Sequence, residues 1–341
     1  MGATIQDIAK KANVSVATVS RVLNNYAHVS KATKKKVEKV MIDLNYLPNA
    51  YARGLSSRNS NIIGVVVPEI SNPFFGGVIK GISTVADREN YNIILCNTDE
   101  DLTKESNSLR MLQEYRIKGM IITPVTESDE YDQKYVETFK NMILDLVLVD
   151  RDIKYGNFKG VFFDDTSALF DLTSLLIING HRDIAIIAGD PKHIVYKRRV
   201  EGYISAFRAN GLEYNPENIH GSSFSISGAY KITKAIINSG KLPTAFVGNS
   251  NMLSMGCFKA ITEKGLIIPD DVAFVGYDAL DMHEILNLNF TLAEKDVELL
   301  GRKAMELLLE CFSGGSCEHN KTILPTKLMV RGSEKFPCNR C

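Results

Sequence analysis

Short apolar segments alternate with amphipathic helical segments from Ile62 onward, and this alternation constrains the fold more than any other feature of the 341-residue chain. The apolar, β-rich segments fall into two series, at 62–68, 91–97, 119–124 and 145–150, and at 159–165, 183–189, 244–249 and 272–278. Helical patterns lie between them at 72–89, 103–117, 129–142, 166–179, 196–210, 227–239 and 250–264. Strands that alternate with helices form parallel, doubly wound sheets. We therefore expect an α/β core of two lobes, one for each series.

Polar and aromatic residues follow several of the expected strands. They are residues 71–75, Asp150 and Arg151, Asn249 to Asn251, and Asp278. Ligands of open parallel sheets bind beyond the carboxyl ends of the strands. The sequence therefore predicts a binding site in a cleft between the two lobes, lined by these loops.

The segment 4–24, TIQDIAKKANVSVATVSRVLN, predicts two short helices joined by a tight turn at Asn13. Thr4 and Asp7 have capping-box spacing, and Ser15 is the expected cap of the second helix. The residues expected to face inward in this second helix are Val16, Val19, Val22 and Leu23, which leaves Ala17, Thr18, Ser20 and Arg21 outside. Such a helix suits insertion into the major groove of DNA. An ordinary helical hairpin is the alternative.

A third helix is expected from Ser30 to Asn45, and with the first two it completes a small module around one core. The following NAYARGLSS pattern is too short to hold a helix alone in water. It is either a disordered linker or a segment that folds when a partner orders it.

The charge distribution favours nucleic acid as the partner of the N-terminal module. The net charge is zero, but residues 1–60 carry ten Lys and Arg against three Asp and Glu, whereas the other 281 residues carry 30 against 37. A basic module on an acidic body places phosphate binding in the first sixty residues, although a solvated charged face has the same composition.

Other classes of protein find little support in the sequence. No signal peptide and no apolar run of 18 residues is present, so we expect a reducing, cytoplasmic location and no membrane contact. The six cysteines lack framework spacing, and the terminal Cys338-Asn-Arg-Cys341 is expected to be a frayed tail rather than a zinc site. No catalytic motif occurs, and we expect no enzyme activity, no catalytic residue, no cofactor and no metal. His181 follows Gly180 and is expected to make a helix-end contact.

The segment 4–24, followed by LPNAYARGL, resembles the LacI/GalR family of bacterial transcriptional repressors. PEISNPFF, NTDED, VDRDI, INGHRDIAII, KRRVEGY, PDDVAFVGYD and LPTKLMVRGS resemble that family's periplasmic-sugar-binding-like core, so the resemblance covers residues 3–333. It implies a helix-turn-helix domain at 1–47, a hinge helix and linker at 48–60, and a two-lobed effector-binding and dimerisation core at 61–333. Residues 334–341 are expected to be a disordered tail.

The resemblance implies a homodimer that binds a palindromic double-stranded DNA operator. Base and phosphate contacts are then expected from Val16, Ala17, Thr18, Ser20 and Arg21, with Thr4, Ser15 and Asn24 near phosphates. A hinge helix in the minor groove would use Asn49, Tyr51, Ala52, Arg53 and Leu55, with Leu55 wedged between base pairs. Gly54 departs from the family pattern, and because glycine costs roughly 1 kcal/mol of helix propensity, a weakly formed hinge is expected.

The resemblance also implies a small sugar-like effector between the lobes. Phe74, Phe75 and Phe224 would sandwich its ring, unless they only pack in the core. Asp150, Arg151, Arg199 and Asp278 would hold hydroxyls, with Asn72, Ser250 and Asn251 nearby, unless the charged groups form surface ion pairs.

Two positions depart from the family pattern. Ser250-Asn251 lacks the usual carboxylate, and Lys295 replaces a frequent ligand Gln. Lys295 either pairs with an acidic effector or is simply exposed. A repressor of sugar utilisation is thus the expected function. The alternative is a global regulator activated by a phosphorylated carrier protein that docks on the core.

Overall fold

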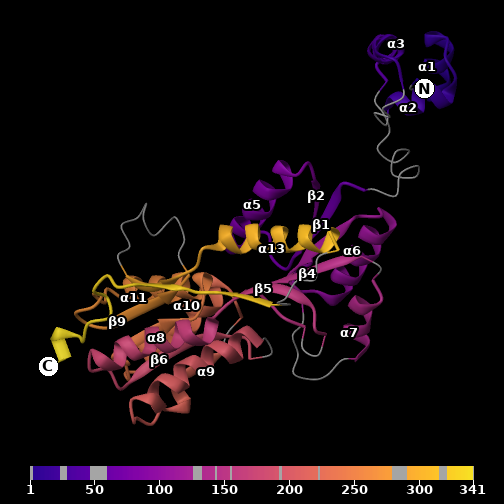
Figure 1. Ribbon diagram of the computed structural model, residues 1–341. Coiled ribbons are helices and arrows are strands. Elements are labelled where there is room, and N and C mark those ends of the chain that lie inside the picture. The colour runs from indigo at the N-terminus through magenta and orange to yellow at the C-terminus, as the bar shows by residue number, and fades with distance from the viewer. Residues whose placement is uncertain are drawn as a thin grey trace. The chain divides into compact units, whose positions relative to one another are not determined.

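The computed structural model divides the chain into two compact units, Met1–Ser60 and Asn61–Cys341 (Figure 1). It describes residues 3–23, 29–46, 60–125, 133–142, 144–153, 156–191, 194–221, 223–278, 290–314 and 321–340. Asn24, Asn49, Tyr51, Ala52, Arg53, Gly54 and Leu55, which the sequence assigns to DNA contacts and the hinge, lie outside the described residues.

The first unit contains the three expected helices, α1 (Ile5–Ala12), α2 (Val16–Leu23) and α3 (Lys31–Asp43). The predicted capping box is present, because the Thr4 hydroxyl accepts from the Asp7 amide and the Asp7 carboxylate accepts from the Thr4 amide. The shared core is formed by Ile8, Ala9, Ala12, Val19, Val22, Val37 and Val40. The prediction for Val16 is wrong, since its side chain is 43% exposed. As the first residue of α2, Val16 precedes the turn of the helix that meets α1 and α3.

The second unit contains two lobes, each built on a six-stranded sheet. The first sheet has the order β11-β5-β4-β3-β1-β2, with all neighbours parallel. Its strands are β1 (Ile62–Val67), β2 (Asn92–Asn97), β3 (Gly119–Ile122), β4 (Asp145–Val149), β5 (Lys159–Phe163) and β11 (Lys321–Leu324). Helices α5 (Pro73–Arg88) and α13 (Val297–Phe312) pack on one face, and α6 (Leu102–Glu114) and α7 (Gln133–Lys140) on the other.

The second sheet repeats this arrangement in the order β12-β10-β9-β8-β6-β7, except that β12 runs antiparallel to β10. Its strands are β6 (Ile184–Gly189), β7 (Ile219–Gly221), β8 (Ala245–Gly248), β9 (Ala273–Tyr277), β10 (Thr291–Glu294) and β12 (Lys327–Met329). Helices α8 (Asp165–Ile178) and α9 (Ile194–Ala209) cover one face, and α10 (Ile226–Asn238) and α11 (Asn251–Glu263) the other. Within the described part of the chain, 3₁₀ turns occur at η1 (Pro216–Asn218) and η2 (Cys338–Arg340).

The assignment of segment 159–165 to the second lobe is wrong. Its strand β5 pairs with β4, with Val147 opposite Lys159, and so extends the first sheet. The chain crosses to the second lobe only after β5, returns after β10, and crosses again between β11 and β12. Each lobe is therefore completed by strands from the C-terminal part of the chain, which the alternation up to residue 278 could not reveal.

The prediction of a disordered tail at 334–341 is also wrong for the residues that the structure describes. Glu334 is buried, and its carbonyl oxygen accepts a hydrogen bond from His181 Nε2 at 3.1 Å. Asn339 donates from its amide to the Asp270 carbonyl at 3.1 Å and from Nδ2 to Asp271 at 2.9 Å. The segment is held because its polar groups complete hydrogen bonds on the second lobe.

The expected helix-end contact of His181 is made by its backbone, whose N–H donates to the Leu176 carbonyl at 3.1 Å. The ring has a separate function, since it is fully buried and links Thr244 to the C-terminal segment. Within the described residues, no helix has the length and apolar character needed to cross a membrane.

Helices α5 and α13 lie side by side on the first lobe and meet at glycines (Figure 1). A Cβ atom on Gly81 would lie 2.1 Å from the Glu298 carbonyl oxygen, and one on Gly301 would lie 2.1 Å from that of Val78. Both clashes involve backbone, so neither helix can relax by moving a flexible side chain. The close approach fixes where α13 packs on the lobe.

We expect Gly81→Ala to lower the free energy of unfolding by roughly 1–3 kcal/mol, because the added methyl group forces the two helices apart. Gly76→Ala on the same helix is the control, since a Cβ there has no atom within 4 Å. It should raise the free energy of unfolding by about 0.4–1 kcal/mol through helix propensity. Urea denaturation measures both values, and equal effects of the two substitutions would contradict the packing argument.

Candidate functional site

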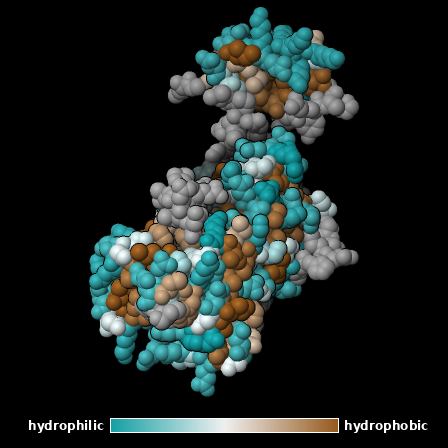
Figure 2. Space-filling model, turned by 90° about the vertical axis from the view of Figure 1, so that its left-hand side faces the viewer, coloured by the Kyte–Doolittle hydropathy of each residue, from teal (hydrophilic) through white to brown (hydrophobic). Residues whose placement is uncertain are grey.

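The outer face of α2 carries the side chains that the sequence assigns to DNA contacts. Ala17 and Arg21, four residues apart, are exposed on one side of the helix, while Thr18 and Ser20 are half-buried. Ser15 caps the helix, with its hydroxyl accepting from the Thr18 amide at 3.1 Å. The basic side chains of α1 and α3 are exposed as well, and hydrophilic groups cover much of the face of this unit that is visible in Figure 2.

A cavity of about 360 Å³ lies between the two lobes of the second unit. Its lining includes all eleven residues proposed from the sequence, namely Asn72, Phe74, Phe75, Asp150, Arg151, Arg199, Phe224, Ser250, Asn251, Asp278 and Lys295. It also includes eight that the sequence did not single out, namely Glu69, Glu100, Asp190, Val195, Ser223, Ser225, Met252 and Tyr277. This volume suits a small organic ligand.

The first-lobe wall contains two phenylalanine rings that also belong to the hydrophobic core. Phe74 and Phe75 are buried, and their rings meet edge to face with centroids 5.0 Å apart. Phe224 lines the second-lobe side and packs against that lobe's core. Core packing and cavity lining are thus not exclusive alternatives for these residues, because each ring has one side in the core.

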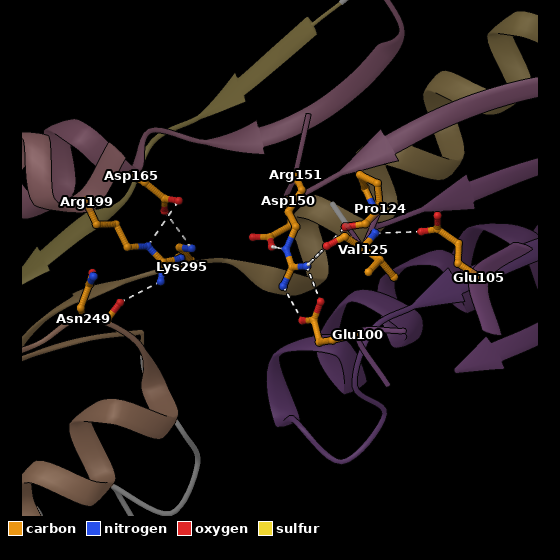
Figure 3. Close-up of polar contacts among 10 residues, drawn as sticks. All are labelled: Glu100, Glu105, Pro124, Val125, Asp150, Arg151, Asp165, Arg199, Asn249 and Lys295. Carbon is orange, nitrogen blue, oxygen red and sulfur yellow. Dashed lines mark hydrogen bonds and ion pairs between the residues drawn. The ribbon is translucent and has the colours of Figure 1, made fainter. Parts of the chain in front are cut away.

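Hydrogen bonds within the first lobe hold the Arg151 guanidinium in place. Its Nη1 and Nη2 each donate to a different carboxylate oxygen of Glu100, both at 2.7 Å, and Nη1 also donates to the Pro124 carbonyl at 3.3 Å (Figure 3). Two parallel hydrogen bonds make this a strong, geometrically specific pair. The guanidinium charge is therefore balanced by the protein itself. Glu100 was missed in the sequence because it lies 51 residues from its partner.

Asp165 is the buried centre of a second charge cluster, and it was not among the residues predicted for the site. Its carboxylate oxygens lie 3.4 Å from Arg199 Nε and 3.1 Å from Lys295 Nζ (Figure 3). Tyr277 donates its hydroxyl proton to the same carboxylate. Burial opposes ionisation of Asp165, but Arg199 and Lys295 outweigh it and hold its pKa well below the ordinary value.

The expectation that Lys295 could be exposed is wrong. The residue is only 6% exposed, and its ammonium group is paired with Asp165. Arg199 is equally buried, and its Nη1 donates to the Asn249 carbonyl at 2.7 Å. The alternative of surface ion pairs is therefore also wrong for both residues. Their position in the lobe junction gives the carboxylate of Asp165 two cationic partners.

Asp150 and Asp278 occupy equivalent places in the two lobes. They follow β4 and β9, which hold the same position in their sheets, and both have left-handed backbones with φ of 66° and 71°. Asp278 is 6% exposed. Burial raises the pKa of Asp278 to about 6, Asp150 and Asp165 add to the increase, and Lys295 and Arg199 oppose it.

Among the residues that the structure describes, the cavity lining is polar without an excess of positive charge. Five of these residues carry carboxylates, namely Glu69, Glu100, Asp150, Asp190 and Asp278, and three carry cationic groups. Asn251 Nδ2 donates to Asn72 Oδ1 at 2.9 Å, a direct hydrogen bond between the lobes. Such a site can offer hydrogen bonds in several directions to a small uncharged ring.

Two family models match the chain. The model for bacterial regulatory proteins of the lacI family matches residues 4–49, and that for periplasmic binding proteins and the sugar binding domain of the LacI family matches residues 60–331. The transcriptional repressor PurR of Histophilus somni is 32% identical over 333 residues, which cover 98% of this chain and 99% of that protein. The regulator RegA of Clostridium saccharobutylicum is 31% identical, with 98% and 99% covered.

Solved structures show the same architecture. The lac repressor dimer bound to operator and the anti-inducer ONPF matches with a TM-score of 0.86 and 25% identity, over 98% of this chain and 100% of that one. A LacI family regulator of Enterococcus faecium with bound ribose matches with a TM-score of 0.69 and 27% identity, over 81% and 99%.

The raised pKa of Asp278 has a consequence for stability. The folded protein binds a proton on the Asp278 carboxylate more tightly than the unfolded chain does. The stability that this protonation contributes is therefore fully present below the ordinary pKa of 3.8 and is lost as pH rises through about 6. Asp278→Asn should therefore raise the free energy of unfolding at pH 8 by up to about 3 kcal/mol and have little effect near pH 4. Denaturation across this range measures it, with exposed Asp87→Asn as the control. A gain that does not depend on pH would contradict the assignment.

Proposed function

Because this chain belongs to the LacI family and is a DNA-binding transcriptional repressor with an effector-binding core, we propose that it acts as a homodimer controlled by a small sugar-like effector. The effector would bind in the cavity between the lobes. The observation that carries this proposal is the coincidence of all eleven predicted effector residues in one cavity lining. The relative with bound ribose supports a sugar as the class of ligand.

The first unit, Met1–Ser60, which we call the head, is proposed to bind DNA through the exposed face of α2. Arg21 and Ala17 lie there, and Ser15 and Thr18 are at the start of the helix, where amide groups favour phosphate. The neighbouring lysines of α1 and α3 would contribute the attraction to the DNA backbone that does not depend on sequence. The hinge contacts around Leu55 stay a prediction.

The charge distribution of the cavity favours an uncharged effector over an acidic one. Arg151 already holds Glu100, and Arg199 and Lys295 already share Asp165. An anionic ligand would have to displace these carboxylates or meet the remaining acids of the lining. The pairing of Lys295 with Asp165 argues against the idea that this lysine pairs with a sugar phosphate or sugar acid.

The effector would act by changing the relative position of the two lobes. Ligands that touch both walls favour one lobe arrangement over others by their difference in affinity. In a dimer this alters the spacing between the two segments that lead to the heads, and hence operator affinity.

The sequence also left open a regulator activated by a phosphorylated carrier protein. The solved structure of CcpA of Lactococcus lactis shares 23% identity and a TM-score of 0.73 with this chain, a likeness that shows the fold alone. The contacts inside the cavity favour the small-molecule reading. Operator titrations with a small molecule alone separate the two, since the carrier mechanism requires a protein partner.

For the effector, we expect a thermal-shift screen to find a neutral sugar that stabilises the full-length protein, while glucose 6-phosphate and gluconate have no effect. The hit should change operator affinity by about tenfold or more, which corresponds to a coupling free energy of about 1.4 kcal/mol. Phe224→Ala should weaken binding of this sugar by about tenfold or more, and it should leave the operator affinity measured without effector unchanged. Ile178→Ala, on an exposed part of the second lobe, is the control. Stabilisation only by the acidic compounds would overturn the neutral-effector proposal, and stabilisation by a purine base would redirect it.

For the head, we expect Arg21→Ala to weaken operator binding and leave effector binding intact. If Arg21 contacts phosphate, the slope of log affinity against log salt should become shallower by about 1, with equal losses on all DNA sequences. If Arg21 contacts a base, the loss should be about 1–3 kcal/mol on the operator and small on unrelated DNA. Fluorescence anisotropy over a salt series measures both, with Lys241→Ala in the second unit as the control. Unchanged operator affinity would remove α2 from the proposed interface.

A further inference from the structure

The ammonium group of Lys295 lies in a box of three aromatic rings. Its Nζ is 4.5 Å from the ring centroid of Tyr277, 4.9 Å from that of Phe163 and 5.3 Å from that of Phe74. Asp165 Oδ1 completes the box at 3.1 Å, and the Lys295 side chain is 1% exposed. Aromatic faces attract cations, most strongly where water is excluded, and aromatic boxes of this kind bind ammonium ligands in other proteins.

The box is assembled from both lobes. Phe74 on α5 and Phe163 at the end of β5 belong to the core of the first lobe. Tyr277 at the end of β9 and Asp165 at the start of α8 belong to the second. Lys295 itself lies where the chain returns from the second lobe to the first after β10. One ammonium group thus contacts side chains of both lobes.

Neutralisation of Asp165 does not by itself explain a lysine here. Arg199 already pairs with this carboxylate at 3.4 Å, and its guanidinium lies 4.6 Å from the Tyr277 ring centroid. A second buried cation carries a large desolvation cost that one shared carboxylate offsets only in part. The three rings and the nearby carboxylate of Asp278 provide the remaining attraction.

We propose that Lys295 is a built-in ligand, whose ammonium group occupies an ammonium-binding box at the lobe junction and holds the two lobes together without effector. The Asn251–Asn72 hydrogen bond is a second, uncharged link across the cavity. Two consequences follow. The effector is confined to the rest of the cavity, and the box accepts a free alkylammonium ion once the lysine side chain is removed.

The test is chemical rescue of Lys295→Ala in the full-length protein, with neither operator nor effector present. The missing atoms correspond to n-propylammonium. We expect the substitution to lower the thermal midpoint by roughly 5 °C or more, since it leaves a buried pair incomplete. Propylammonium chloride should restore at least half of this loss in a saturable manner. Equal concentrations of n-propanol, which lacks the charge, and of sodium chloride should not.

Two further variants control for general effects. Lys303→Ala removes a lysine that is 48% exposed and paired with Glu306, and it should show neither the loss nor the rescue. Lys295→Met keeps an apolar chain in the box, so it should lose stability without responding to propylammonium. If Lys295→Ala does not fold alone, recovery of folding in propylammonium but not in propanol supports the proposal.

An absent loss of stability, rescue by propanol as well as by the amine, or no rescue at all would overturn it. The proposal goes beyond the effector function, and since the assay contains no DNA and no sugar, its failure leaves the proposed repressor function untouched.

Discussion

The buried carboxylate of Asp165 is the interaction on which the cavity depends. It lies at the start of α8, where the N-terminus of a helix favours negative charge, and it holds Arg199, Lys295 and Tyr277 in place. Each partner also lines the cavity. Loss of one member of such a cluster leaves an uncompensated charge in a dry environment, which is far more costly than loss of a surface ion pair. The geometry of the site is thus set by electrostatics at the lobe junction.

The two lobes repeat one strand order, and this repetition explains the chemistry of the cavity. Asp150 and Asp278 directly follow the equivalent strands β4 and β9, so a carboxylate approaches from each side. The neighbouring cations are paired within the protein, Arg151 with Glu100, while Arg199 and Lys295 share the carboxylate of Asp165. The result is a site with many hydrogen-bonding groups and little net attraction for anions, as expected for a ligand recognised through hydroxyl groups.

Local sequence patterns predict where a side chain lies when its place along its own strand decides its position. Polar residues directly after buried parallel strands lie at one edge of a sheet, and for this reason Asp150, Asn251 and Asp278 were correctly placed beside one cavity. The missed residues are those defined by a distant partner. Glu100 belongs to the site because Arg151 donates hydrogen bonds to it. Asp165 belongs to the site because it pairs with Lys295, which lies 130 positions further along the chain. Periodicity shows that a side chain is buried but not which charge it meets.

Local sequence patterns predict the three N-terminal helices, the strand–helix alternation of the core and the set of polar residues at the strand ends, because capping, turns and hydrophobic periodicity are local properties. They do not predict that β5 joins the first lobe, that residues 334–340 dock on the second, or that Lys295 is buried. These outcomes depend on pairings between segments far apart in the chain. A strand joins the sheet whose edge it can complete, and a charge is buried only where a distant counter-charge offsets its desolvation.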